Sequence, residues 1–450
     1  MRAKSHMTAL WCFLLIGVVA IGSFVWINLS PSVARVDPGN PTVLSGPRAK
    51  ILDRDGVVLV SGQGKNRTNL FDELFQPVIG IASPGIGVAG IESRFSDRLV
   101  NTGQARLSYF GRNPEPEPLR TTLSLTVQRA ADRALGPRRG AVVVLDATGG
   151  EVWAQVSHPN YSPKMLKKNW KTLKESPDSP LFDRASSASR YPPGSVMKIA
   201  DALLLLKKST APFHCPGSVV VNGSVIRCPH PHGHVSGLAD GFARSCNSMF
   251  IQRTLAETSP EEFYRSARKL GFVIPDSVEN GGENKWALAV IGQGGVSLAP
   301  VQAARIAAAV VNDGMMPEPL YVKEKGKHER VMEPGEANLL RQLMEGVVKV
   351  GTGRGLFDLT RQGARLGLKT GTAQVERKKG YVDWAVGFYT PPAQTRMFAF
   401  AVVVEDADGY ASEVCLPIVR QIVYALRARV EKRDMATSTW NTRDRGKPKS

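Results

Sequence analysis

Apolar residues alternate with polar ones, or run without interruption, in five short stretches, and they recur with helical spacing in longer stretches. The stretches 141–145 and 151–156 flank a Gly-Gly turn and predict a β-hairpin. Further strands are predicted at 366–375, 382–389 and 397–405, and helices at 126–135, 300–312, 337–350 and 411–430. Strands near both ends therefore enclose a helical middle, which predicts an α+β fold with one mainly antiparallel sheet between helical layers.

The N-terminal region contains a long apolar run. Residues 9–29 carry no charged side chain, and about twenty apolar residues can span a bilayer as a helix. The alternative is a cleaved signal peptide with Ser32-Val33-Ala34 as its cleavage site, but the run is longer than such peptides need. We therefore predict a cytoplasmic tail at 1–8 and a transmembrane anchor at 9–29.

The rest of the chain divides by composition. Residues 30–118 are rich in Gly, Pro and short apolar runs, and 47–60 reads as strand, Asp-Gly turn and strand. The alternation of Pro and Glu at 114–118 predicts a stiff connector. We expect a small membrane-proximal domain at 30–118 and a large domain at 119–430. The polar, basic tail at 431–450 is expected to be disordered.

The chain of 450 residues has a net charge of +18 and a sequence pI of about 9.8. It has no zinc-finger spacing, RNA-recognition motif or lysine-rich block, so we expect no nucleic-acid partner. Anionic lipid or cell-wall polymer is a better match for the excess of positive charge.

Ser195 follows two prolines and a glycine and opens an apolar run that predicts a helix ending near Lys207. Residues three apart share a helix face, so Lys198 is expected one turn above Ser195. A serine hydroxyl needs a base to become a good nucleophile. A buried lysine kept neutral could be that base. The alternative without a catalytic role is a surface helix with a polar N-cap.

Two later motifs strengthen this interpretation. In Ser245-Cys246-Asn247, side chains two apart on an extended segment would point the same way, so Ser245 could pass a proton while Asn247 binds a substrate amide. Lys369-Thr370-Gly371-Thr372 lies in an apolar strand, where Gly371 would let a substrate backbone approach the strand edge. Taken singly, the first motif could be a loop between helices and the second a kinked edge strand. Together with Ser-x-x-Lys, and in this order, they are the signature of penicillin-binding proteins and serine β-lactamases.

The chain resembles a class B penicillin-binding protein, a membrane-anchored peptidoglycan D,D-transpeptidase, over residues 45–430. Beyond the three motifs, the resemblance includes 49–56 and 87–92 in the membrane-proximal region, 291–296 with 300–302, and 383–388. It implies the transpeptidase fold of that family with a small β-rich pedestal at 30–118. The pedestal is shorter than in most members, and no segment is long enough for the glycosyltransferase domain of bifunctional relatives.

The resemblance also implies a chemistry. A donor stem peptide ending in D-Ala-D-Ala, or a β-lactam, would acylate Ser195, with Lys198 as base and Ser245 and Lys369 as the proton route to the leaving amine. The remaining implied site residues hold the donor (Asn247, Thr370, Gly371 and Thr372) or form an oxyanion hole from backbone N–H groups (Ser195 and Thr372). No metal or organic cofactor is implied. The implied location is the bacterial cell membrane with the catalytic domain outside, and the implied partner is a SEDS-family glycosyltransferase.

A group of cysteines and histidines precedes the second motif (His214, Cys215, Cys228, His230, His232 and His234). In an oxidising compartment Cys215 and Cys228 suggest a disulfide. Free thiols and a zinc site remain alternatives, because Cys and His are also zinc ligands. Cys246 and Cys415 are expected to be buried small residues rather than reactive thiols.

Two other functional classes are compatible with parts of the sequence. The first is a serine hydrolase on the same fold, a D,D-carboxypeptidase or β-lactamase, although no Glu is evident for activating a water in deacylation. The second is a non-catalytic β-lactam sensor or wall-synthesis scaffold. A sensor needs a cytoplasmic signalling domain that residues 1–8 cannot supply, and a scaffold has no need for Ser195, Lys198, Ser245 and Lys369 together.

Overall fold

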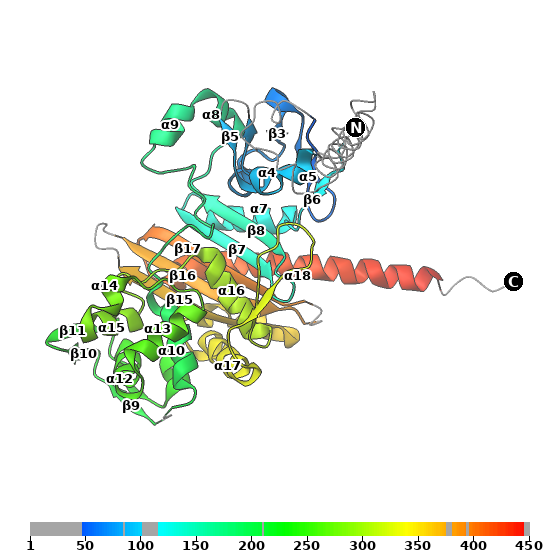
Figure 1. The fold of residues 1–450 in the computed structure, drawn as a ribbon. Coiled ribbons are helices and arrows are strands. Elements are labelled where there is room, and N and C mark those ends of the chain that lie inside the picture. Colours follow the sequence, from blue (N-terminus) through cyan, green and yellow to red (C-terminus); the bar gives the residue numbers. More distant parts are fainter. Residues whose placement is uncertain are drawn as a thin grey trace, which may run out of the picture. The chain divides into compact units, whose positions relative to one another are not determined.

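The computed structural model describes residues 47–83, 86–100, 116–208, 211–374, 380–392 and 396–444 (Figure 1). The predicted tail and anchor at 1–29 lie outside these residues. No helix in the described ranges is both long and apolar enough to cross a membrane. Contacts divide the chain into two units, the smaller formed by the described parts of Met1–Lys50, Ser61–Arg67 and Ile81–Leu119. This division differs from the predicted boundary at residue 118, because Ile51–Val60 and Thr68–Gly80 have their contacts within the larger unit.

The smaller unit is organised around a buried carboxylate. Glu92 accepts hydrogen bonds from Arg48 Nε at 2.8 Å and from Arg67 Nε at 2.5 Å, and all three side chains are buried. Its regular elements are η2 (Gly64–Asn66), β4 (Ala82–Ser83), β5 (Gly87–Val88), α4 (Gly90–Arg94) and α5 (Ser96–Val100). Arg48, directly before the stretch 49–56 singled out in the sequence, thus forms an ion pair with Glu92, the last residue of the stretch 87–92. Losing Glu92 would remove the carboxylate that both buried guanidinium groups share.

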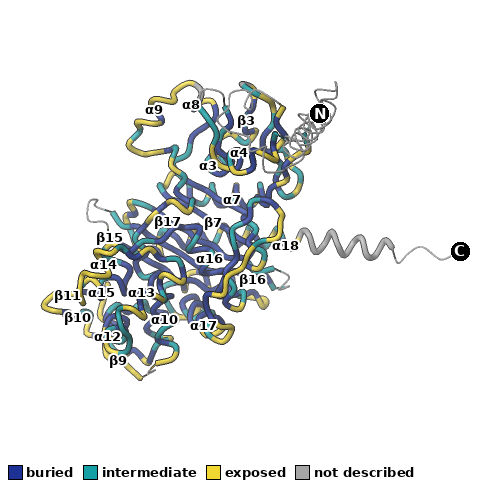
Figure 2. The backbone as a smooth tube through the Cα atoms, viewed as in Figure 1, coloured by how far each residue is buried: buried dark blue, intermediate teal, exposed yellow. Residues whose placement is uncertain are grey.

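The centre of the larger unit is a five-stranded antiparallel sheet in the order β15-β16-β17-β7-β8. Its strands are β7 (Gly140–Asp146), β8 (Val152–His158), β15 (Arg365–Gln374), β16 (Tyr381–Thr390) and β17 (Phe398–Ala407). Every residue of β7 is buried, as expected for an apolar strand covered on both faces (Figure 2). The predicted hairpin, the three C-terminal strands and the antiparallel sheet are therefore confirmed. Because β15 ends the sheet, its outer edge has no strand partner in that sheet.

Helices cover the two faces of this sheet. Helices α7 (Leu125–Leu135) and α18 (Ala411–Asp444) pack on each other and on one side, whereas α16 (Pro300–Val311) packs on β7, β16 and β17 from the other side (Figure 1). Ser124 caps α7 by accepting from the N–H of Val127, and α16 begins with a proline at its first turn. Helix α17 (Pro334–Val350) packs on β15 and α16. The predicted helices in this unit are all present.

The helical middle lies between β8 and β15 in the sequence. Helix α10 (Lys198–Leu205) packs on α11 (Leu238–Ala243), α12 (Asn247–Glu257), α13 (Pro260–Lys269) and α17. Two short ribbons adjoin it, β9 (Phe213–Cys215) with β12 (Gly233–Val235), and β10 (Ser218–Val221) with β11 (Ser224–Arg227). The other elements are α8 (Pro163–Lys168), α9 (Trp170–Glu175), α14 (Asp276–Glu279), α15 (Gly282–Val290), β13 (Met315–Pro317), β14 (His328–Arg330) and η5 (Arg354–Gly363).

Short elements also precede the large sheet in the sequence. The predicted hairpin at 47–60 forms as β1 (Ile51–Leu52) and β2 (Val58–Ser61), which pair antiparallel. Asp53 stabilises the turn because its Oδ1 accepts from the N–H groups of Asp55 and Val57. These strands form a small sheet with β3 (Thr68–Asn69) and β6 (Leu119–Arg120), in the order β3-β2-β1-β6, and η3 (Asp72–Phe75) and α3 (Gln76–Ile79) follow β3.

The closing helix is longer than the sequence analysis predicts. Helix α18 continues to Asp444, whereas we expected a disordered chain from residue 431. Residues 431–436 are mostly good helix formers, and no glycine or proline occurs between residue 431 and Gly446. Val430 is still buried at 7% exposure.

Candidate active site

The amine of Lys198 lies at the centre of the three predicted motifs. Its Nζ is 3.0 Å from Ser195 Oγ, 2.6 Å from Asn247 Oδ1, and 2.7 and 3.1 Å from the carbonyl and hydroxyl oxygens of Ser245. A neutral amine has two N–H donors and one lone pair. The two shortest contacts, to Asn247 Oδ1 and the Ser245 carbonyl, take the two donors, which leaves the lone pair for the proton of Ser195.

Burial shifts this amine towards its neutral form. The side chain of Lys198 is fully buried, and removal from water lowers the pKa of Lys198 to about 8, although the thiols of Cys228 and Cys246 and the carboxyl of Asp201 oppose the shift. A base with a pKa near the working pH combines a large neutral fraction with useful proton affinity. The buried Lys198 is therefore suited to accept a proton from Ser195.

This leads to a prediction for the pH dependence of acylation by penicillin. The reactive form of Lys198 is neutral, so the rate should rise with pH while the lysine loses its proton and level off above about 8. The second-order rate constant for a fluorescent penicillin, measured between about pH 6 and pH 10, should therefore have its midpoint near the lowered pKa. A rate still rising towards the ordinary lysine value of 10.5 would contradict the assignment.

Ser245 connects the two buried lysines of the site. Its hydroxyl lies 3.1 Å from Lys198 Nζ and 2.9 Å from Lys369 Nζ. Lys369 is also fully buried, and burial followed by the charge of Lys198 holds the pKa of Lys369 well below its usual value. A hydroxyl can accept one hydrogen bond and donate another, so Ser245 can pass a proton between its neighbours.

The backbone of the second motif differs from the prediction. Ser245 has φ of +60°, in the left-handed region, and Asn247 is already the first residue of α12, so the motif is not an extended segment. The side chains of Ser245 and Asn247 nevertheless both reach Lys198, because the left-handed turn redirects the chain between them. Such a conformation costs about 1 kcal/mol or more for a non-glycine residue, so the surrounding contacts must hold it.

Ser195 lies in a tight turn rather than inside the predicted α-helix. Residues Gly194–Met197 form the 3₁₀ turn η4, and α10 begins only at Lys198. Gly194 has φ of +52°, and its N–H donates to the carbonyl of Gly292 at 3.0 Å. A Cβ on Gly292 would come within 2.0 Å of the Gly194 carbonyl oxygen. Only a glycine at 292 therefore allows the segment at 291–296 to pack so closely against the turn that contains Ser195.

Gly371 has a packing role that the sequence analysis did not identify, and its predicted role towards the substrate stays a prediction. A Cβ there would meet the carbonyl oxygen of Pro193 at 2.7 Å and the side chain of Val196 at 3.0 Å. The missing side chain thus allows β15 to pack against the Ser195 turn. Trp384 of the neighbouring strand β16 adds a hydrogen bond from Nε1 to the carbonyl of Pro192 at 3.0 Å.

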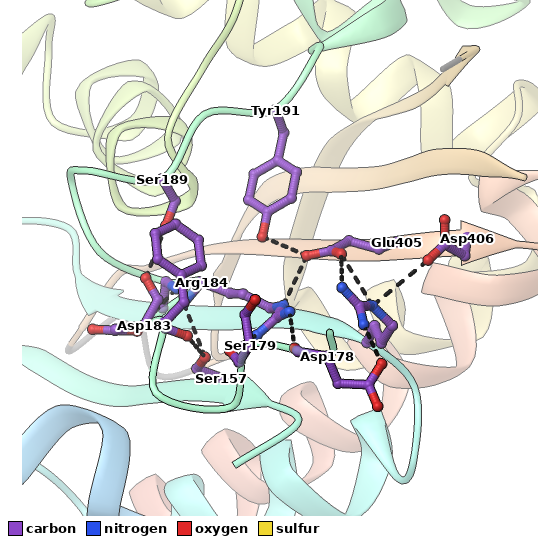
Figure 3. Close-up of polar contacts among 12 residues, drawn as sticks. Ser157, Asp178, Ser179, Asp183, Arg184, Ser189, Tyr191, Glu405 and Asp406 are labelled. Carbon is purple, nitrogen blue, oxygen red and sulfur yellow. Dashed lines mark hydrogen bonds and ion pairs between the residues drawn. The ribbon is translucent and has the colours of Figure 1, made fainter. Parts of the chain in front are cut away.

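A network of charged side chains holds the segment that leads into this turn (Figure 3). Glu405 of β17 accepts from the hydroxyl of Tyr191 and from Arg184 Nε, both at 2.8 Å, and from Arg139 on its other oxygen. Burial, and then the nearby Glu405, raise the pKa of Tyr191, so its hydroxyl remains a donor. Arg184 also donates to the carbonyls of Asp178 and Ser179. The network therefore fixes the chain four residues before Ser195 to the central sheet.

The two threonines of the third motif have partners that the sequence analysis did not identify. The hydroxyl oxygens of Thr370 and Thr352 are 2.6 Å apart. Thr372 donates to Asp383 Oδ1 at 2.7 Å and accepts from the N–H of Ala411. Burial raises the pKa of Asp383 to about 6. The hydroxyl hydrogen of Thr372 is therefore directed to Asp383, so binding of a substrate carboxylate by this hydroxyl stays a prediction.

The contact with Thr352 yields a prediction for the variant Thr352→Val. Valine keeps the shape but removes the hydroxyl that orients Thr370, so acylation by penicillin should become about fivefold less efficient, corresponding to about 1 kcal/mol. Thr360→Val is a suitable control because its hydroxyl bonds only the carbonyl of Phe357 within its own turn. Equal rates for the two variants would show that Thr352 does not orient Thr370.

The predicted disulfide between Cys215 and Cys228 is absent from the structure. Their sulfur atoms are 3.7 Å apart, whereas a disulfide requires about 2.05 Å. Cys215, Cys228, Cys246 and Cys415 are all free thiols and all buried. The last two thus have the burial that the sequence analysis expected. The predicted disulfide is therefore wrong, and Cys215 and Cys228 are two neighbouring free thiols.

The sequence of this chain is similar to those of known proteins. Residues 140–424 match the family described as the penicillin binding protein transpeptidase domain. The chain is 30% identical over 396 residues to peptidoglycan D,D-transpeptidase PbpA of Mycolicibacterium smegmatis, covering 76% of this chain and 79% of that protein.

Solved structures of penicillin-binding protein A from Mycobacterium tuberculosis are also similar. Its ceftriaxone acyl-enzyme complex gives a TM-score of 0.76 at 25% identity, over 86% of this chain and 99% of the other. Its penicillin G acyl-enzyme complex gives 0.73 at 25% identity, over 85% and 100%. The matched family region includes Ser195, Ser245 and Lys369.

Proposed function

This chain belongs to the penicillin-binding protein transpeptidase family, and from that membership we propose that it is a peptidoglycan D,D-transpeptidase acting through an acyl-enzyme on Ser195. The observation that carries the assignment of the nucleophile is the contact of 3.0 Å between Ser195 Oγ and the buried amine of Lys198. The resemblance of the sequence motifs to class B penicillin-binding proteins agrees with the match to the penicillin-binding protein transpeptidase domain. Relatives solved as β-lactam acyl-enzymes support the same chemistry.

In the acylation step, Lys198 takes the proton of Ser195 while Oγ attacks the carbonyl carbon of the penultimate D-Ala of a donor stem peptide. The negative oxygen of the tetrahedral intermediate would be held by the backbone N–H groups of Ser195 and Thr372. The C–N bond then breaks, and the terminal D-Ala leaves as an amine after receiving a proton. The contacts of Ser245 with both lysines support a proton route from Lys198 through Ser245.

In the transfer step, the amine of a second stem peptide attacks the ester carbonyl of the acyl-enzyme. A new amide bond forms, the ester bond to Oγ breaks, and Ser195 recovers its proton. A β-lactam follows only the first step, because its opened ring stays attached where the acceptor would enter. No additional cofactor is required by this sequence of bond changes.

The donor would lie along the free edge of β15. An extended peptide can add to an exposed strand by main-chain hydrogen bonds, and β15 ends its sheet. Thr370 on this strand would hold the terminal carboxylate, and Thr372 would join it by turning its hydroxyl hydrogen from Asp383 to the carboxylate. Asn247 would orient a donor amide, since its Nδ2 is fixed by the carbonyl of Arg227 and its Oδ1 by Lys198.

The test of this function is the fate of a donor peptide ending in D-Ala-D-Ala, incubated with a peptide that carries an acceptor amine. A transpeptidase releases D-Ala and forms a cross-linked product, detected by mass spectrometry, that requires Ser195. Release of D-Ala with only the shortened donor as product, at all acceptor concentrations, would favour the carboxypeptidase alternative.

We also propose that residues 9–29 anchor the protein in the bacterial cell membrane with its catalytic domain outside, and that a SEDS-family glycosyltransferase is its partner. The apolar run supports the anchor, and the resemblance to membrane-anchored class B penicillin-binding proteins supports the partner. Recovery of the protein in the membrane fraction after a high-salt wash tests the anchor, and a soluble mature form beginning near Arg35 would refute it. Co-purification that survives replacement of both 9–29 and 45–110 would refute the proposed contact.

A further inference from the structure

Four side chains with metal-ligating atoms lie together at the second motif, which contributes one of them, Cys246. The ligand atoms of Cys215, Cys228, His232 and Cys246 all lie within 4.8 Å of one another, and all four residues are buried. They come from separate places: the end of β9, the residue after β11, the loop before β12, and the cap of α12. A disulfide would use only two of these four donors, so it does not account for the group.

We propose that Cys215, Cys228, His232 and Cys246 bind one zinc ion. Zinc in a tetrahedral site has bonds of about 2.3 Å to sulfur and about 2.05 Å to nitrogen. This geometry places two sulfur ligands roughly 3.8 Å apart, and a sulfur and a nitrogen ligand roughly 3.5 Å apart. The sulfur of Cys228 lies 3.7 Å from that of Cys215 and 4.0 Å from that of Cys246, and Cys215 Sγ lies 3.5 Å from His232 Nδ1. The existing distances therefore fit a zinc ion with little movement.

The surrounding donors suit sulfur atoms that carry negative charge. Cys228 Sγ lies 3.4 Å from the N–H of Ser248 and 3.3 Å from its hydroxyl, and Cys246 Sγ accepts from the N–H of Met249 at 3.4 Å. These N–H groups belong to the first turn of α12, where the helix dipole stabilises thiolates. Such contacts from outside the ligand set orient the ligands of a metal and tune its affinity.

Three cysteines and one histidine make a closed ligand set, which is typical of structural zinc. Cys246 lies between Ser245 and Asn247, both of which contact the catalytic amine. Fixing Cys246 to two neighbouring ribbons would hold the left-handed turn at Ser245 and the start of α12 together. The zinc ion would therefore position the second motif without taking part in the bond changes.

The test is the zinc content of the full-length protein purified in detergent without chelators. The wild type should contain about one zinc per chain, and Cys215→Ser and Cys246→Ser should lose most of it. Cys415→Ser is the matched control, because Cys415 is an equally buried thiol outside the group, and it should retain the metal. A wild type without zinc would overturn the proposal, whether its thiols are free or peptide mapping shows a Cys215–Cys228 disulfide.

A second experiment uses a variant outside the ligand set. Ser248→Ala keeps all four ligands and removes only the hydroxyl near Cys228, so zinc affinity measured by competition with a chelator should fall about tenfold or more. Cobalt(II) exchanged into the wild type should give the visible bands of a tetrahedral thiolate site. Unchanged affinity together with octahedral cobalt spectra would contradict the proposal. Both readouts are independent of acylation, so a failed zinc site would leave the transpeptidase assignment standing.

Discussion

The variant Ser195→Ala should lose covalent labelling by penicillin completely. No other hydroxyl can replace Oγ as the nucleophile, because Ser245 Oγ is engaged by both lysines and belongs to the proposed proton route. Removing the nucleophile of a serine enzyme lowers turnover by about 10⁶-fold, so the acylation rate should fall below detection. The measurement is in-gel fluorescence with a fluorescent penicillin over a time course.

The matched control for this variant is Ser187→Ala, at an exposed serine eight residues earlier in the chain. It should label at the wild-type rate. Circular dichroism should show that both variants fold, because the Ser195 side chain contributes one hydroxyl to the site. Labelling of Ser195→Ala at a rate close to that of the control would mean that another residue is the nucleophile.

The second large effect is expected for Lys198→Met. Methionine retains most of the buried volume but has no basic amine to accept the Ser195 proton. Loss of a general base typically costs about 10²- to 10⁴-fold, and the rate constant for acylation should fall in that range. The remaining reaction should also lose the pH midpoint near 8 that is expected for the wild type.

Lys207→Met is the control for this substitution, because Lys207 follows the same helix, is exposed and pairs with Glu336 at the surface. It should leave both the rate and its pH dependence unchanged. A wild-type pH profile in Lys198→Met, whatever its rate, would show that a different group accepts the proton.

Much of the fold could be predicted because its strands and helices are strongly patterned. The continuous apolar runs of β7, β16 and β17 are typical of strands covered on both faces, and the flanking helices have clear caps or prolines. The residues that meet in the candidate site could be singled out because short motifs fix their identity and order. Spacing alone does not fix backbone conformation, which is why the helix predicted at Ser195 is a 3₁₀ turn.

What the sequence could not provide are contacts between distant segments. Thr352 lies in a glycine-rich loop, 18 residues before Thr370 in the sequence. No local sequence pattern indicates that the two hydroxyls are in contact. Asp383 lies opposite Thr372 only because β15 and β16 pair in this register. The left-handed turn at Ser245 has no glycine to signal it. The cysteines and His232 were visible as candidates, but only the folded chain shows that Cys246 completes a group of four.

The most direct test of the account is the mass of the intact wild-type protein during incubation with penicillin G, followed by peptide mapping of the adduct. The protein should gain the full mass of one penicillin molecule, carried on Ser195, and the adduct should persist for many minutes because no base for an attacking water is evident. Attachment at another residue would contradict the assignment of Ser195. Rapid return to the unmodified mass with release of opened penicillin would contradict the transpeptidase assignment and identify a hydrolase.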